Sequence, residues 1–171
     1  PERWEKTLEM LKKYDLSVLP YYEYAGSVGT EGVGLKKHAR PLSRDDSYTH
    51  VWWAERFYAD VTHPDTLPDA QKVLEATIVR YKDDAHFIGA WFRTRNSHIP
   101  MSFSDDTLAR FTQECRLDEP ATREKLLADQ SLLNQYYRWW FDQRKAFLVA
   151  LRDYLRADIG EIVIDHPAVY R

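Results

Sequence analysis

The chain has 171 residues, of which 44% are apolar and 30% are charged, a balance typical of a globular domain and not of a disordered segment. The net charge of −3 and the lack of a basic tract argue against nucleic acid as a partner. The single cysteine excludes a disulfide within the chain, and no apolar run approaches the roughly 20 residues that a membrane span needs.

The first part of the chain predicts a helix, a strand and a long loop. Amphipathic spacing predicts a helix over 2–14, and the apolar run 16–22 predicts a short strand. A polar stretch over about 24–64 follows, with a short helix expected within 51–61. Loops of this length in a compact domain usually carry function.

The second part of the chain alternates helices with two further strands. A capping box of Thr66 and Asp69 predicts a helix start, and that helix extends to about residue 82. A strand over 86–92, a polar loop over 93–103 and a helix starting after Ser104 come next. Residues 122–156 have helical spacing, as one long helix or as two with a break, and 160–166 predicts a last strand.

This alternation predicts an α/β fold in which parallel strands alternate with helices through right-handed crossovers. Polar residues follow each predicted strand. The carboxyl ends of parallel strands share one edge of a sheet, and ligands bind at that edge.

The size of the predicted sheet indicates a piece of a larger fold. Three strands are few for a complete α/β domain, and the chain opens without an initiator methionine. We therefore expect 1–171 to be a single domain that forms part of a larger (β/α)₈ barrel, the TIM barrel fold. A small three-layer domain with one more strand is the alternative.

Two short sequences carry a resemblance to a known family. A helix ends in RYKDD at 80–84, and the following strand contains IGAW at 88–91. These two motifs resemble the region around strands three to five of clan A glycoside hydrolases, especially the β-galactosidase-like (β/α)₈ barrels. The segment 136–156, YYRWWFDQRKAFLVALRDYLR, resembles the same region. The resemblance covers most of the chain, and its motifs are moderately specific. It implies hydrolysis of a carbohydrate by two carboxylates around the scissile bond.

The chain departs from that family at the position of the acid/base. The family carries Asn-Glu after its fourth strand, whereas the corresponding positions here are Thr94 and Arg95. An arginine stays protonated near neutral pH, so it cannot replace a general acid. The resemblance implies that the nucleophile would follow Arg171.

Charged side chains after the strands are the candidate catalytic and binding groups. The strand-end acids Asp165 and Glu23 are the candidate catalytic carboxylates; the alternative role is a helix cap or an ion pair for Asp165, and an ion pair, for example with Arg44, for Glu23. Arg93 and Arg95 could bind an anionic sugar together with Asn96, or they could pair with acids of the long loop. His166, beside Asp165, is a further candidate contact.

Aromatic side chains are the candidate stacking groups. Rings make up 14% of the chain, a content that suits either a ring-rich core or a sugar-binding surface. The candidate contacts are Tyr22 and Trp91 next to strand ends, and His50, Trp52 and Trp53 in the long loop, where both tryptophans could instead cover the core. We expect no cofactor and no metal, although His50, His98 and His166 leave a zinc site as a remote alternative.

Together these patterns predict a glycoside hydrolase-like barrel segment that acts on a carbohydrate, which is neutral or anionic. The alternatives are a non-catalytic carbohydrate-binding barrel and a protein-interaction domain. The expected partners are the carbohydrate and either the remainder of the barrel or a second copy of the chain, with neither nucleic acid nor membrane involved.

Overall fold

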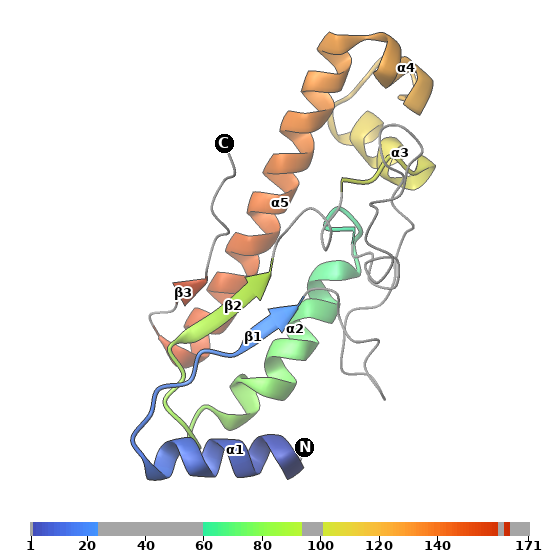
Figure 1. Ribbon diagram of the computed structural model, residues 1–171. Helices are drawn as coiled ribbons and strands as arrows, with labels where there is room; N and C mark the ends of the chain where they lie inside the picture. Colours follow the sequence, from blue (N-terminus) through green and yellow to red (C-terminus); the bar gives the residue numbers. More distant parts are fainter. Residues whose placement is uncertain (1, 24–59, 94–100, 161–162, 165–171) are drawn as a thin grey trace.

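The computed structural model describes residues 2–23, 60–93, 101–160 and 163–164 (Figure 1). Three strands and a set of helices make up this part of the chain. In chain order they are α1 (Glu2–Lys13), β1 (Tyr21–Glu23), α2 (Thr66–Thr77), the 3-10 helix η3 (Val79–Tyr81), β2 (Gly89–Arg93), α3 (Asp105–Glu114), α4 (Arg123–Ala128), α5 (Gln130–Ile159) and β3 (Val163–Ile164).

The three strands form one sheet in the order β1-β2-β3, and both pairings are parallel. Each lies within or at the end of an apolar run that predicted a strand, but each is shorter than its run. Helices separate the strands along the chain, as the sequence predicted. Membership of this sheet in a (β/α)₈ barrel stays a prediction, because three strands alone do not define a barrel.

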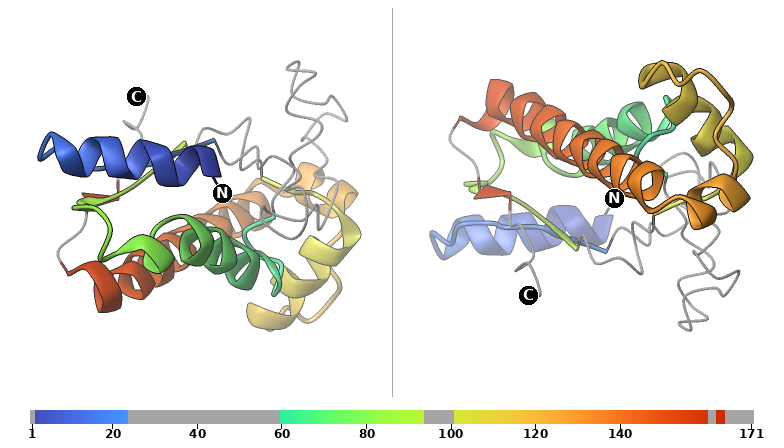
Figure 2. Two further views of the ribbon diagram at one scale, coloured as in Figure 1. Left: turned by 90° about the horizontal axis from the view of Figure 1, so that it is seen from below. Right: turned by 90° about the horizontal axis from the view of Figure 1, so that it is seen from above.

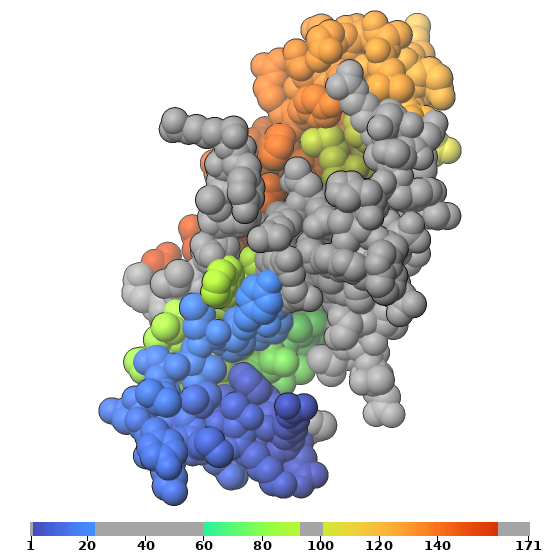
Figure 3. Space-filling model, in the orientation of Figure 1, coloured from blue at the N-terminus to red at the C-terminus, as the bar shows by residue number. Residues whose placement is uncertain are grey.

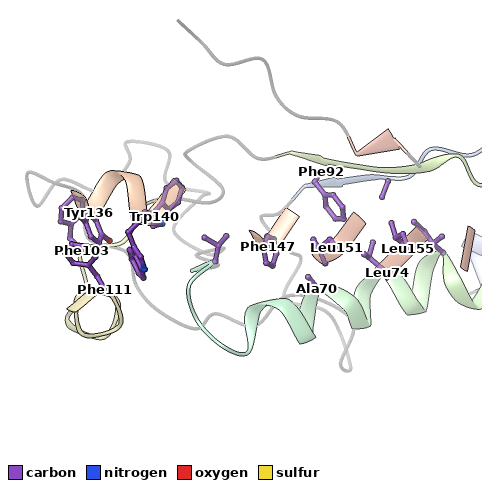
Figure 4. Packing of buried hydrophobic residues seen from close by; sticks show 14 of the residues in the cluster. Ala70, Leu74, Phe92, Phe103, Phe111, Tyr136, Trp140, Phe147, Leu151 and Leu155 are labelled. Carbon is purple, nitrogen blue, oxygen red and sulfur yellow. The ribbon is translucent and has the colours of Figure 1, made fainter. Parts of the chain in front are cut away.

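Two helices cover one face of the sheet. Helices α2 and α5 contact each other and lie side by side on this face (Figures 1 and 2). Figure 4 shows Phe92 of β2 pointing toward these helices, where Leu74 of α2 and Leu151 and Leu155 of α5 lie buried. Burial of such side chains stabilises the domain by roughly 1.5–3 kcal/mol each. The main core therefore lies between the sheet and the α2–α5 pair.

Gly89 changes the alternation of side chains along β2. An isolated bridge joins Val18 to Phe87, and the regular pairing resumes with Tyr21 opposite Trp91. The β2 side thus contains one residue more than the β1 side between these two pairs. Gly89 has φ of 145°, a backbone conformation that side chains rarely adopt. The extra residue resembles a β-bulge, and it restores Ala90 and Phe92 to the covered face.

Helix α1 lies across the end of the sheet at which the strands begin (Figure 1). Its apolar face buries Leu8, as the amphipathic spacing predicted. Trp4 Nε1 donates a hydrogen bond of 3.0 Å to the carbonyl oxygen of Thr77, and the Tyr81 hydroxyl donates to Glu5. These contacts fix α1 to the end of α2 and to η3.

Helices α3 and α4 pack at the N-terminal end of α5, beyond the ends of the strands (Figure 1). Phe103, Phe111, Tyr136 and Trp139 form a ring cluster there, with neighbouring centroids 5.1–5.7 Å apart. The predicted helical stretch 122–156 proves to be two helices. Asp129 ends α4 and caps α5, because its side chain accepts from the amides of Ser131 and Leu132.

Candidate functional site

Two aromatic side chains stand on the sheet face that α2 and α5 leave uncovered. Tyr21 and Trp91 are register partners on β1 and β2, and they remain 48% and 44% exposed. Their rings meet edge to face, with centroids 5.4 Å apart and an interplanar angle of 76°. Figure 3 shows side chains of β1 and β2 reaching the surface near the middle of the molecule. Trp91 was predicted as a sugar contact, whereas Tyr21 was not.

Tyr22 lies on the opposite, helix-covered face. Its ring stacks on Phe92 with centroids 5.2 Å apart, and its hydroxyl is 2.6 Å from Thr77 Oγ1. Burial raises the pKa of Tyr22 from 10.0 to about 12, and the hydrogen bond with Thr77 opposes this shift. Because these contacts engage the ring and the hydroxyl within the core, Tyr22 does not lie beside the Tyr21–Trp91 pair, although the sequence predicted it as a sugar contact.

The carboxyl ends of β1 and β2 bring two charged residues into register. The backbone pairs Glu23 with Arg93, one a candidate catalytic acid and the other a candidate anion-binding group. Both positions come two residues after the exposed aromatic pair on the same strands.

The other predicted site residues lie outside the described part of the chain. They are His50, Trp52, Trp53, Arg95, Asn96, Asp165 and His166. Asp165 and His166 follow β3 directly in the sequence, and β3 pairs with β2. The sequence therefore still predicts a carboxylate, Asp165, directly after β3, the strand next to the β2 strand that contains Arg93.

A buried carboxylate lies on the side of the sheet toward which the strands point. The Asp60 side chain is 0% exposed and accepts four hydrogen bonds. Oδ1 accepts from the amide and the hydroxyl of Thr62 at 2.9 and 2.7 Å. Oδ2 accepts from Thr107 Oγ1 at 2.6 Å and from Arg110 Nη2 at 2.8 Å. The segment that leads into α2 is thereby bonded to the first two turns of α3.

The network continues from Thr107 to α5. Ser104 Oγ is 2.9 Å from Thr107 Oγ1, and Ser102 Oγ donates to Ser104 Oγ at 3.0 Å. The Tyr136 hydroxyl donates to the carbonyl oxygen of Ser102. Burial raises the pKa of Tyr136 far above its ordinary value, and the negative charge of Asp60 adds to this shift.

Sequence reasoning missed the Asp60 network. One local signal was available, because an aspartate two residues before a threonine, as in Asp60-Val61-Thr62, is typical of a turn in which the carboxylate accepts from the chain. The partners on α3 are more than 40 residues away, so no local pattern could predict them.

Metal and thiol chemistry find no support within the described ranges. No group of three or more His, Cys, Asp or Glu side chains is arranged there to hold a metal ion. His50, His98 and His166 of the zinc alternative lie outside these ranges. Burial raises the pKa of Cys115, and the charge of Glu114 acts in the same direction, so its thiol is a poor nucleophile near neutral pH.

Comparisons of the chain with protein-family models, curated proteins and solved structures returned no match. Among the described helices, none is both long enough and apolar enough to cross a membrane. The arrangement itself therefore carries the functional argument. It comprises two exposed rings, an acidic and a basic residue in backbone register at the strand ends, and a buried carboxylate that joins the start of α2 to α3.

Proposed function

We propose that the chain is part of a (β/α)₈ barrel that binds and hydrolyses a carbohydrate at the carboxyl ends of its parallel strands. The observation that carries this proposal is the exposed pair of Tyr21 and Trp91 on the uncovered sheet face. Single exposed apolar side chains are common on protein surfaces, whereas adjacent exposed rings on one face are typical of a ligand or partner site.

A carbohydrate suits this partner for two reasons. Flat sugar faces stack on aromatic rings, and Trp91 offers an accessible ring surface to such a face. Sugar hydroxyls also need polar groups close to the stacking surface. Glu23 and Arg93, paired in register two residues beyond the rings, supply an acceptor and donors on the same strands.

The proposed chemistry uses strand-end carboxylates. Glycoside hydrolysis needs one carboxyl group that protonates the leaving oxygen and a second that acts as nucleophile or base. Asp165 and Glu23 are the two acids that directly follow or end strands of this sheet. Arg93 and Arg95 would favour a carboxylated or sulfated sugar, because a guanidinium binds such groups through two parallel hydrogen bonds.

The test is turnover of a panel of neutral and anionic aryl glycosides by the full-length protein and its Asp165→Asn and Glu23→Gln variants. We expect hydrolysis by the unchanged protein and a loss of at least about a hundredfold in kcat for the variant that lacks the acid. If both variants retain full turnover, neither carboxylate is catalytic. If the unchanged protein hydrolyses nothing in the panel, the hydrolase proposal is wrong.

A second candidate function is carbohydrate binding without hydrolysis. Thr94 and Arg95 occupy the positions at which the resembled family carries its acid/base, and this departure favours a barrel that has lost catalysis. Such a protein would bind a sugar in calorimetric titration yet release no aglycone from any aryl glycoside.

The third candidate, a protein-interaction domain, is favoured by the exposed apolar side chains Leu19 and Ile88 near the start of the sheet. It predicts a concentration-dependent dimer in sedimentation and no affinity for sugars. A monomer that binds a sugar would exclude it.

A further inference from the structure

We infer that the sugar carries a methyl group, in place of a hydroxyl, at the end of its ring remote from the bond that is hydrolysed. That end lies on Leu19 and Ile88, an aliphatic pair that extends the exposed rings of Tyr21 and Trp91 toward the strand starts. The inference rests on the proposed carbohydrate function and adds to it the chemical class of the sugar, a 6-deoxyhexose.

The aliphatic pair lies on the same sheet face as the two rings. Val18 and Phe87, joined by the isolated bridge, are each 5% exposed and face the core. Leu19 and Ile88 directly follow them in the sequence and are 37% and 36% exposed. Because side chains alternate along a strand, both aliphatic side chains point to the uncovered face. The bridge between their neighbours places them side by side.

The position of the candidate acid determines which end of the sugar meets the aliphatic pair. Glu23 ends β1 two residues beyond Tyr21, whereas Leu19 precedes Tyr21 by two residues. The bond that is hydrolysed must lie beside a catalytic carboxylate, so the anomeric carbon of a sugar stacked on the rings points toward the strand ends. The opposite end of the sugar ring, which carries the substituents of C4 and C5, then lies toward Leu19. Two residues of a strand span roughly 7 Å, which is close to the length of one hexopyranose.

The chemistry of the aliphatic pair favours a methyl group over a hydroxyl. Neither Leu19 nor Ile88 has a side-chain donor or acceptor, so a hydroxyl placed on them loses its hydrogen bonds to water without replacement. The residues two positions earlier, Ser17 and His86, are polar, and Ser17 Oγ is 3.1 Å from His86 Nδ1. Because this polar pair follows so closely, the apolar group that the aliphatic pair accommodates is a short one.

The size of the face suits a sugar better than a second protein. The side chains of Leu19, Tyr21, Ile88 and Trp91 are 36–48% exposed, which leaves on the order of 300 Å² of accessible surface. A stable protein–protein interface needs roughly 800 Å² from each partner. The described part of this face is therefore too small to hold a second copy of the chain by itself, whereas one sugar ring with its methyl group fits it.

The experiment compares methyl glycosides of 6-deoxyhexoses with those of the parent hexoses in the gluco, galacto and manno series. Calorimetric titration of the full-length protein gives the Kd for each sugar, and sedimentation reports self-association. Leu19→Asn and Ile88→Thr introduce polar groups into the aliphatic pair. Leu127→Asn is the matched control, because Leu127 is 42% exposed on α4, which packs at the N-terminal end of α5.

We expect the 6-deoxy sugar of at least one series to bind about tenfold more tightly than its parent. Leu19→Asn and Ile88→Thr should reduce this ratio to about threefold or less, and Leu127→Asn should leave it unchanged. If every parent sugar binds as tightly as its 6-deoxy form while Trp91→Ala weakens both, the rings bind a sugar but the methyl inference is wrong. If no sugar binds, the proposed function is wrong and the inference falls with it. A dimer that Leu19→Asn dissociates would identify the face as a protein interface and overturn the inference.

Discussion

Replacement of Asp60 by asparagine should destabilise the protein by about 3 kcal/mol. The buried carboxylate accepts four hydrogen bonds, one of them from the guanidinium of Arg110. An asparagine carbonyl can accept only the two bonds on one side, and its amide hydrogens then face the donors on the other side. In one orientation of the asparagine side chain, its amide hydrogens face the backbone amide of Thr62. In the other orientation, they face the donors of Arg110 and Thr107.

The magnitude follows from the burial of the two charges. The Asp60 side chain is 0% exposed and that of Arg110 is 20% exposed, so solvent screens this pair far less than a surface pair. Breaking a buried pair by removing one partner costs about 3–5 kcal/mol, and the partial exposure of Arg110 favours the lower end. With a urea m-value of about 2 kcal/mol/M, the unfolding midpoint should fall by about 1.5 M.

Urea unfolding monitored by circular dichroism measures this change. Asp142→Asn is the matched control, because Asp142 is exposed on α5 and the same substitution there should alter stability by no more than about 0.5 kcal/mol. A double-mutant cycle with Arg110→Met should give a coupling of about 1 kcal/mol or more. A loss below about 1 kcal/mol for Asp60→Asn, or additive effects in the cycle, would refute the reasoning.

Three further predictions concern the sheet. Gly89→Ala should cost about 1–3 kcal/mol in urea unfolding, because alanine cannot adopt a φ of 145° without strain; an unchanged midpoint would contradict the extra-residue geometry. Trp91→Ala should cost less in the same assay than the roughly 3–5 kcal/mol typical of a fully buried ring, because 44% of Trp91 is exposed; a loss in that range would show that the ring is structural. Burial raises the pKa of Tyr22 to about 12. The neutral phenol therefore contributes its full stability to the folded state below pH 10, and this contribution is lost as the pH rises toward 12. Tyr22→Phe should flatten that alkaline loss of stability, and an identical pH profile would argue against the buried phenol.

Local patterns predicted most of the helices. The amphipathic spacing of 2–14 agrees with α1, and the acidic start after Ser104 agrees with α3. The start of α2 was wrong by one residue. Asp65 is the N-cap, and the Thr66 hydroxyl donates instead to the carbonyl oxygen of Asp60. The Thr66 hydroxyl, which the capping box was expected to use as the N-cap, is thus engaged in a tertiary hydrogen bond instead.

The strands were harder to delimit, because apolar runs do not show where hydrogen bonding begins. The run 16–22 predicted a continuous strand, but only Val18 forms a bridge before β1 begins at Tyr21. The extra residue at Gly89 depends on pairing with another strand, and the glycine inside the run 86–92 was a local hint of it that did not fix its position in the sheet.

The candidate site was predicted in part. The rule that polar residues collect after parallel strands selected Glu23 and Arg93, and the structure pairs them in register. The exposed face could not be assigned before the register was known. For that reason the sequence selected Tyr22, whose neighbour Tyr21 is the ring beside Trp91. The Asp60 network required contacts between segments far apart in the chain.

The central claim is that the uncovered sheet face binds a carbohydrate through Trp91. Calorimetric titration of the full-length protein with neutral and anionic oligosaccharides tests it most directly, with Trp91→Ala and Phe141→Ala compared in parallel. Phe141 is 53% exposed on α5, a helix that covers the other face of the sheet, so its variant controls for loss of an exposed ring. We predict saturable binding that Trp91→Ala weakens by at least about tenfold and Phe141→Ala leaves unchanged. Equal affinity of the unchanged protein and Trp91→Ala, or no binding by either, would contradict the claim.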